Sequence, residues 1–200
     1  MYEYVDEVLK KLVRALQLLF RQYRQMKFDE LNVLEKTSEL YQRAESLNWE
    51  AFFSIFRFYY WREYGDEKVE MPSDGVVEAW LADVLHTPSQ VMKYAYDSEI
   101  TRKRDRLIES LNATHGNPQE IDKALRYWVQ MAGWFAVEVA DAAVKQARED
   151  MSIDLVMWLS ERDGHVCKDC SALDGQIFHM RGLPPKPHPN CRCYTVVVKG

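Results

Sequence analysis

Every cysteine of this 200-residue chain lies in one stretch, HVCKDCSALDGQIFHMRGLPPKPHPNCRC, which covers residues 165–193. The same stretch holds three of the five histidines. Its spacing, C-x2-C-x17-H-x2-C-x-C, contains two half-sites, each able to present two thiolate or imidazole ligands to one tetrahedral cation. This pattern predicts a metal site in a reducing environment.

The favoured ligands form a Cys3His set: Cys167, Cys170, His188 and Cys191. Cys193 is the alternative, because residues 191 and 193 of an extended segment point to the same face, and an all-cysteine set stays open. Zinc in a structural role is the expected cofactor, since it accepts both donor types without redox activity. It also lets a module of under about 50 residues fold with almost no hydrophobic core.

Three other interpretations of the cysteines compete with a metal site. The cysteines can be reduced thiols in a small core, because free cysteine is commonly buried, or they can form disulfides in an oxidising medium. A redox-active CxxC is the least favoured, because we do not expect this pair to open a helix after a strand. His165 and His179 rank below His188 as ligands.

The composition is that of an ordinary globular protein, with 47% hydrophobic and 28% charged residues. A formal net charge of −5 argues against a protein that coats nucleic acid by bulk charge. The N-terminus has acidic residues (Glu3, Asp6, Glu7) where a secretory leader would be basic, and no apolar run reaches the roughly 20 residues of a membrane span. We therefore expect synthesis in a reducing cytoplasm and no membrane association.

Residues 1–150 are predicted to form a helical bundle with short connections. Asn48 is expected to cap a new helix, Pro88 to open another, and the run Asn117-Pro118-Gln119-Glu120 to begin the longest. The expected helices cover about 3–27, 29–46, 49–64, 75–86, 88–111 and 118–151.

Residues 151–200 change character and are predicted to form a second, smaller domain. IDLVMWLS (153–160) and CYTVVVKG (193–200) are typical of strands, and Asp174-Gly175 has the signature of a tight hairpin turn. The predicted fold class is mainly α: a helical bundle with a small C-terminal β-hairpin module held by zinc.

Two features of the bundle allow a structural or a functional interpretation. The aromatic run 49–64 is favoured as a core helix over an interaction surface, because aromatic side chains are mostly buried. A basic cluster is a candidate for nucleic-acid contact through phosphates, although interleaved acidic residues favour a solvated helix face. The cluster consists of Arg102, Lys103, Arg104 and Arg106.

Motifs of common enzymes are missing. The sequence has no G-x-S-x-G, H-E-x-x-H, Walker-type loop or G-x-G-x-x-G pattern. The zinc-deaminase pattern also fails, because a glutamate is absent from the required place. We therefore predict a protein that is not an enzyme and has no catalytic residues.

Between residues 157 and 193 a half of the form W…D…VC..C..LDG..F is followed at a short distance by P.HP.CRC. The positions concerned are Trp158, Asp163, Val166, Cys167, Cys170, Leu173, Asp174, Gly175, Phe178, Pro187, His188, Pro189, Asn190, Cys191, Arg192 and Cys193. This pattern resembles the signature of the Mu F-like phage head morphogenesis family, the minor head proteins of tailed bacteriophages. The likeness covers about 40 of the 200 residues.

The resemblance implies a low-copy protein of the virion head, assembled in the host bacterial cytoplasm, that assists head assembly, DNA packaging or ejection near the portal. The implied partners are the portal protein, the major capsid protein or both, with self-association open and any DNA contact weak. The motif and turn positions of the module would be Trp158, Asp174, Gly175, Pro189 and Arg192. The alternative is a zinc-ribbon nucleic-acid-binding module, in which the metal orders a hairpin for phosphate or base contact.

Overall fold

The computed structural model describes residues 1–65, 70–161 and 166–198. It is mainly helical with a small C-terminal antiparallel sheet, so the predicted fold class is confirmed. The elements are α1 (Glu3–Arg24), α2 (Val33–Tyr64), α3 (Asp74–His86), α4 (Tyr96–Ala113), α5 (Pro118–Asp150), β1 (Leu155–Leu159), α6 (Lys168–Leu173), β2 (Ile177–His179), the 3-10 turn η1 (Met180–Gly182) and β3 (Tyr194–Val197).

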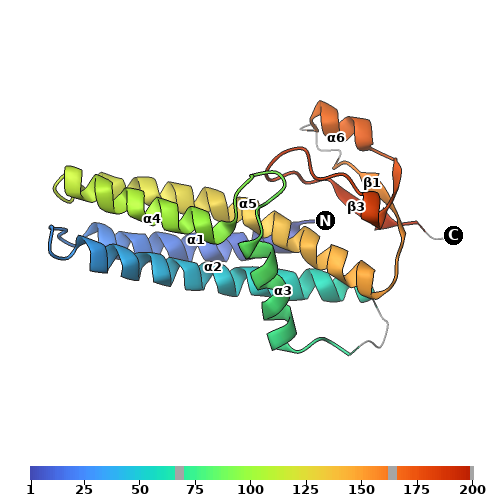
Figure 1. Cartoon of the computed structure of the whole chain (residues 1–200), viewed down its shortest axis with the longest axis horizontal. Coiled ribbons are helices and arrows are strands. Elements are labelled where there is room, and N and C mark those ends of the chain that lie inside the picture. The colour runs from blue at the N-terminus through green and yellow to red at the C-terminus, as the bar shows by residue number, and fades with distance from the viewer. Residues whose placement is uncertain (66–69, 162–165, 199–200) are drawn as a thin grey trace.

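The four long helices α1, α2, α4 and α5 lie side by side along the long axis of the molecule, and α3 runs across them (Figure 1). The small sheet and α6 sit at one end of this bundle, next to the N-terminus (Figure 1). None of the described helices is long and apolar enough to cross a bilayer.

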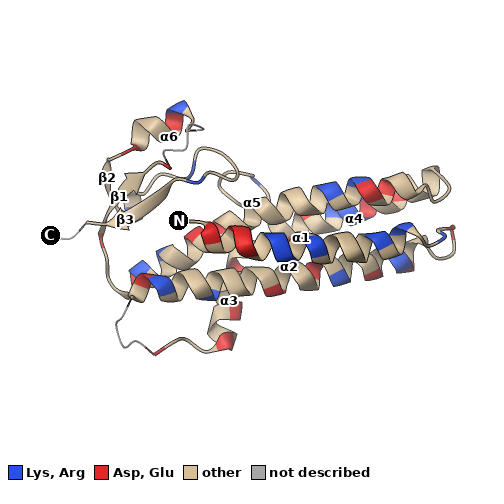
Figure 2. Cartoon of the chain, turned by 180° about the vertical axis from the view of Figure 1, so that it is seen from behind, with Lys and Arg blue, Asp and Glu red and all other residues tan. Residues whose placement is uncertain are grey.

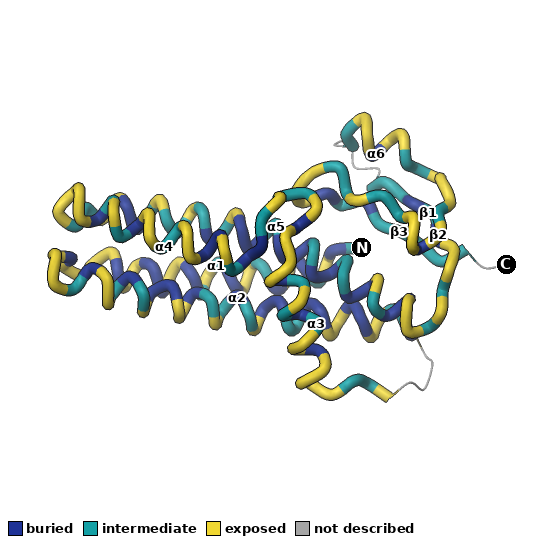
Figure 3. The backbone as a smooth tube through the Cα atoms, viewed as in Figure 1, coloured by how far each residue is buried: buried dark blue, intermediate teal, exposed yellow. Residues whose placement is uncertain are grey.

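The core of the bundle follows from the apolar stripes of its helices, whose buried sides face one another (Figure 3). Trp128 of α5 is fully buried, and its ring meets Phe20 of α1 and Tyr41 of α2 edge-on, with centroids 6.4 and 5.2 Å apart. Such edge-to-face pairs are favourable beyond the area that they bury. Aromatic contacts therefore link three of the long helices.

The aromatic run 49–64 is mostly core, as the favoured interpretation holds. Five of its rings are buried, whereas Phe58 and Trp61 are 39% and 58% exposed on the outside of α2. Phe58 stacks on Tyr4 of α1, with ring centroids 4.0 Å apart. The buried members are Phe52, Phe56, Tyr59, Tyr60 and Tyr64.

Two predicted helix starts are wrong. Asn48 does not begin a helix but lies buried inside α2, because its side-chain amide donates to the hydroxyl of Tyr96 at 2.9 Å. The segment after Pro88 is a turn, in which the Ser89 hydroxyl accepts backbone N–H groups of Val91 and Met92. Because these local bonds satisfy the backbone without a helix, α4 begins at Tyr96.

The predicted start of α5 is confirmed. The side chain of Asn117 accepts the N–H of Gln119 at 3.0 Å, and Pro118 occupies the first turn. Gly116 just before it has a φ of +79°, and a Cβ there would lie 2.6 Å from the carbonyl oxygen of Phe28. This turn therefore needs glycine for both its backbone angle and its close approach.

The sheet has the strand order β2-β1-β3, with β1 antiparallel to both neighbours. The predicted tight hairpin turn at Asp174-Gly175 is wrong, because the chain makes α6 between β1 and β2. Gly175, with a φ of +78°, instead follows the end of α6, and its N–H donates to the carbonyl of Trp158 at 2.8 Å. Asp-Gly serves here as a helix exit, a position that also favours glycine.

Arg148 near the end of α5 joins the bundle to the sheet. It is 3% exposed; its Nε donates to Glu63 of α2 at 2.8 Å, and its Nη2 donates to the carbonyl of Thr195 in β3 at 2.9 Å. A buried guanidinium that satisfies a carboxylate and a strand carbonyl at once fixes both elements relative to α5.

We predict that Arg148→Ala lowers the free energy of unfolding by about 2 kcal/mol, because the half-buried Glu63 carboxylate loses its closer cation and keeps only Arg62 at 3.8 Å, and the Thr195 carbonyl loses a donor. Urea unfolding followed by circular dichroism measures the change. Lys145→Ala is the control: that side chain is exposed and 3.6 Å from Glu149, so its loss should cost under about 0.5 kcal/mol. Equal effects of the two substitutions would contradict the joining role of Arg148.

Candidate metal centre

The structure brings all four cysteines and His188 into one cluster. Cys167 and Cys170 come from the start of α6, and the other donors come from the segment between η1 and β3. Two overlapping groups result, and within each every pair of donor atoms is within 4.8 Å. The first group is Cys167, Cys170 and His188, and the second is Cys170, Cys191 and Cys193.

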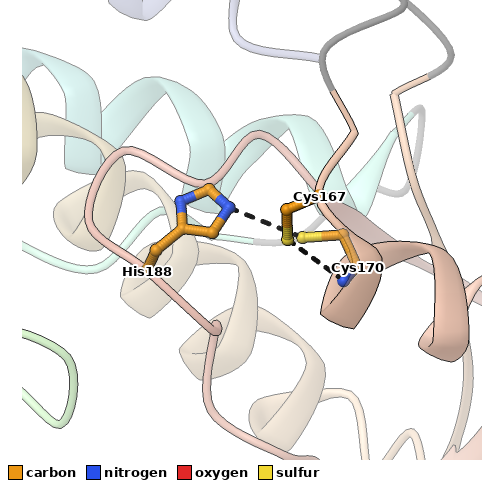
Figure 4. A group of neighbouring side chains, drawn as sticks. All are labelled: Cys167, Cys170 and His188. Carbon is orange, nitrogen blue, oxygen red and sulfur yellow. Dashed lines mark hydrogen bonds between the residues drawn. The ribbon is translucent and has the colours of Figure 1, made fainter.

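Cys170 is the shared member of both groups. Its sulfur lies 3.7 Å from Nε2 of His188, which points at it from the opposite segment (Figure 4), and 3.4 Å from the sulfur of Cys191. A tetrahedral ion with metal–sulfur bonds of about 2.3 Å has donor–donor edges of roughly 3.5–3.8 Å. The spacing around Cys170 therefore fits a tetrahedral ion, and the cluster can hold a metal.

The predicted set of Cys167, Cys170, His188 and Cys191 is not gathered into one mutual group. Cys191 falls in the second group with Cys193, so the structure offers five donors to a site that needs four. The sequence allows either Cys193 or another residue as the fourth ligand, and the geometry is compatible with both choices. Any complete four-donor set needs members of both groups.

The local fold of α6 positions its two cysteines. Cys167 is the residue before the helix, and its sulfur accepts the backbone N–H of Cys170 at 3.3 Å. The expectation that this pair does not open a helix is therefore wrong. The pair nevertheless differs from an isolated CxxC, because two further sulfurs and an imidazole surround Cys170.

The four thiols differ in environment, and all are free of disulfides. The N–H of Cys170 lowers the pKa of the Cys167 thiol, because it stabilises the thiolate. Burial raises the pKa of the Cys170 thiol strongly and also raises that of Cys191. Cys170 and Cys191 are thus stable as neutral thiols unless a cation offsets their desolvation.

Lys186, together with two groups on the bundle side, holds the backbone of the second half-site. The Lys186 ammonium donates to the carbonyl of Cys191 at 2.9 Å and pairs with Asp141 of α5 at 2.6 Å. The Tyr2 hydroxyl lies 3.1 Å from the carbonyl of Cys193 and 2.6 Å from Asp141. The N-terminal residues and α5 thereby orient the chain that carries two of the donors.

The predicted motif positions on the first half of the module serve its packing. Trp158 is 2% exposed and packs in a small core with three of the cysteines, Cys170, Cys191 and Cys193. The Asp174 carboxylate accepts the backbone N–H of Ser160 at 2.7 Å, which ties the exit of α6 to the end of β1.

The predicted motif positions on the second half connect the donors to the bundle. The Arg192 guanidinium makes two hydrogen bonds to Asp6 of α1, at 2.9 and 2.5 Å. Pro189 follows His188, and its carbonyl lies 3.1 Å from Nδ1 of that imidazole. If Nδ1 carries the proton, this contact leaves Nε2 free to bind a metal.

Other sequence candidates are not part of the cluster. His179 lies in β2 and is paired with Asp154 at 2.9 Å, whereas His165 and Asp163 lie outside the described residues. In the basic cluster of α4, Arg102 and Lys103 pair with the buried Glu99. Arg104 pairs with Asp105 at 3.0 Å, so acidic and basic residues lie next to one another along this helix (Figure 2).

Sequence reasoning missed the supporting residues Tyr2, Asp6, Asp141 and Lys186. They contact the half-site across sequence separations of up to 191 residues, which no local pattern reveals. One signal was available for Asp141: the largely apolar run 131–144 contains two carboxylates, Glu138 and Asp141, and a buried carboxylate needs a partner.

Comparison of the chain with models of protein families, with curated proteins and with solved structures found no match. The assignment of the cluster therefore depends on its own geometry and on the local motif.

Because Cys170 belongs to both donor groups, we predict that Cys170→Ser removes metal binding, since it leaves two donors in each group and none shared. His188→Ala or Cys193→Ser keeps Cys170 beside the remaining donors and should give a weaker site. Titration with Co²⁺, followed by its thiolate charge-transfer band, measures the difference. We expect a loss of at least roughly a hundredfold in affinity for Cys170→Ser. His179→Ala, in the same module but outside the cluster, is the control with unchanged binding; equal losses at all positions would argue against a central Cys170.

We also predict that metal affinity rises with pH between about 6 and 8. The raised pKa values of Cys170 and Cys191 mean that both are protonated without metal, and binding must release those protons. Two released protons give up to about a hundredfold change in affinity for each pH unit. Competition against a chelator of known pH dependence checks this, and an affinity independent of pH would show that the two thiols do not ligate.

Proposed function

We propose that the cluster holds a structural zinc ion. The donors are sulfur and imidazole without a carboxylate, which favours zinc over the hard cations calcium and magnesium. The sheet has three short strands and its own core is small, so a metal would supply stability that burial alone does not.

We further propose that the protein acts in head assembly of a tailed phage, as the resemblance to the Mu F-like family implies. The observation that carries this proposal is that the motif residues converge: both half-sites and Trp158 form one cluster, while Arg192 anchors it to α1. A motif whose parts meet in space is more specific than the same letters spread over a fold. The role is structural, with the portal or major capsid protein as partner.

The alternative, a nucleic-acid-binding module, gains no support from the basic cluster of α4. Three of its four cations are paired with Glu99 or Asp105, so phosphate contact would have to displace existing ion pairs. The net charge of −5 also opposes association with DNA. Weak DNA contact is therefore expected at most, with an affinity that falls steeply with salt.

Two measurements test the proposal. Metal analysis of the purified chain should find about one zinc per chain, lost in Cys170→Ser and kept in His179→Ala. Co-expression with the portal protein encoded in the same genome should give a stable complex with the wild-type chain. A zinc-free wild type would refute the structural role, and strong salt-dependent DNA binding without a portal or capsid complex would favour the nucleic-acid alternative.

A further inference from the structure

A cavity of about 630 Å³ lies where α5, the turn at residues 87–92 and the segment 180–195 meet. Its size falls within the roughly 300–1,000 Å³ of pockets that bind small ligands. Apolar side chains form much of its wall, among them Met92, Trp134, Val137 and Leu183. The cavity also reaches residues of the metal cluster, but its most unusual group lies on α5.

That group is Glu138, a half-buried carboxylate in the cavity wall. Its Oε1 accepts a hydrogen bond from the Ser89 hydroxyl, and its Oε2 has no hydrogen-bond or ion-pair partner among the described residues. Burial raises the pKa of this carboxyl, and the Lys186 ammonium, which is paired with Asp141, offsets that rise only in part. Glu138 lies one helical turn after Trp134 on α5, so the two side chains share a face.

The other charged groups inside the cavity wall are already paired. Among the described residues of the wall, Asp83, Lys145, Glu149 and Arg181 are exposed, whereas the interior charges other than Glu138 form ion pairs. These interior pairs are Asp141 with Lys186 and Arg148 with Glu63, and the exposed Lys145 and Glu149 pair with each other. Among the described residues of the cavity wall, Glu138 is thus the interior charged side chain without an ion-pair partner. A cationic ligand could neutralise it.

We propose that this cavity binds the cationic end of a ligand with an apolar stem, an alkylammonium or alkylguanidinium group, with Glu138 as its anionic partner. The Trp134 indole and the neighbouring aliphatic groups receive the stem, and an aromatic face beside a carboxylate suits a cation. The group can belong to a free amine or to a Lys or Arg side chain of a polypeptide. This site does not depend on the proposed role in head assembly.

The test uses three probes on the full chain: n-butylguanidinium, the neutral n-pentanol, and an acetylated, amidated peptide Pro-Leu-Arg-Leu-Pro. The indole N–H signal of Trp134, assigned with Trp134→Phe, reports binding by NMR. We expect a saturable shift with butylguanidinium and none with pentanol. A peptide that binds more tightly than butylguanidinium identifies a polypeptide source, and one that binds more weakly identifies a free amine.

Glu138→Gln keeps an acceptor for Ser89 but removes the charge, so the affinity for butylguanidinium should fall about tenfold or more. A melting temperature at or above the wild-type value shows that the fold is intact. Glu149→Gln, at an exposed carboxylate of the same cavity lining, is the matched control and should change affinity by less than about twofold. The proposal is overturned if the wild type shows no saturable shift, or if Glu138→Gln binds as the wild type does.

Discussion

The C-terminal module depends on the contact between its two half-sites around Cys170. Its three short strands pack on a small core of Trp158, Cys170, Cys191 and Cys193, and the larger core belongs to the bundle. A segment of this size buries too little apolar surface to offset its conformational entropy unaided. Contacts among the sulfur and imidazole atoms of the cluster therefore contribute to the stability of the whole module, because they join α6 to the segment that precedes β3.

The same constraint explains why the module is attached to the bundle by charged groups. Asp6 bonds Arg192, Asp141 bonds Lys186, and Arg148 bonds the carbonyl of Thr195. The first two pairs join α1 and α5 to the segment that carries the donors, and the third joins α5 to β3. A metal that binds the cluster only when the module is docked on the bundle would stabilise these contacts. By thermodynamic linkage, the contacts would then raise the affinity of the cluster for the metal.

The sequence predicted the features that depend on local chemistry. The start of α5 followed from Asn117 and Pro118, whose capping and proline preferences act within one turn. The cluster of possible metal ligands was predicted from residue types and spacing, because both half-sites are short in sequence. The fold class followed in the same way, from helical periodicity that changes to β-branched strands near residue 153.

The features that the sequence did not reveal depend on partners far along the chain. Asn48 is a residue type that is common at helix N-caps, but here its side-chain amide donates to the Tyr96 hydroxyl, which stabilises it inside α2. Asp174-Gly175 is typical of a hairpin turn, yet here it ends α6, and the Gly175 N–H donates to the carbonyl of Trp158 in β1. In both places a residue with two local preferences takes the one that tertiary contacts satisfy.

Lys186 and Asp141 place the cluster and the cavity in one electrostatic system. Lys186 bonds the carbonyl of Cys191 on one side and Asp141 on the other, and both residues line the cavity that contains Glu138. Since Asp141 raises and Lys186 lowers the pKa of Glu138, any shift of Lys186 with the donor segment changes the charge that Glu138 experiences. On our two proposals, we expect a metal in the cluster and a cation in the cavity to influence each other through this one ammonium group.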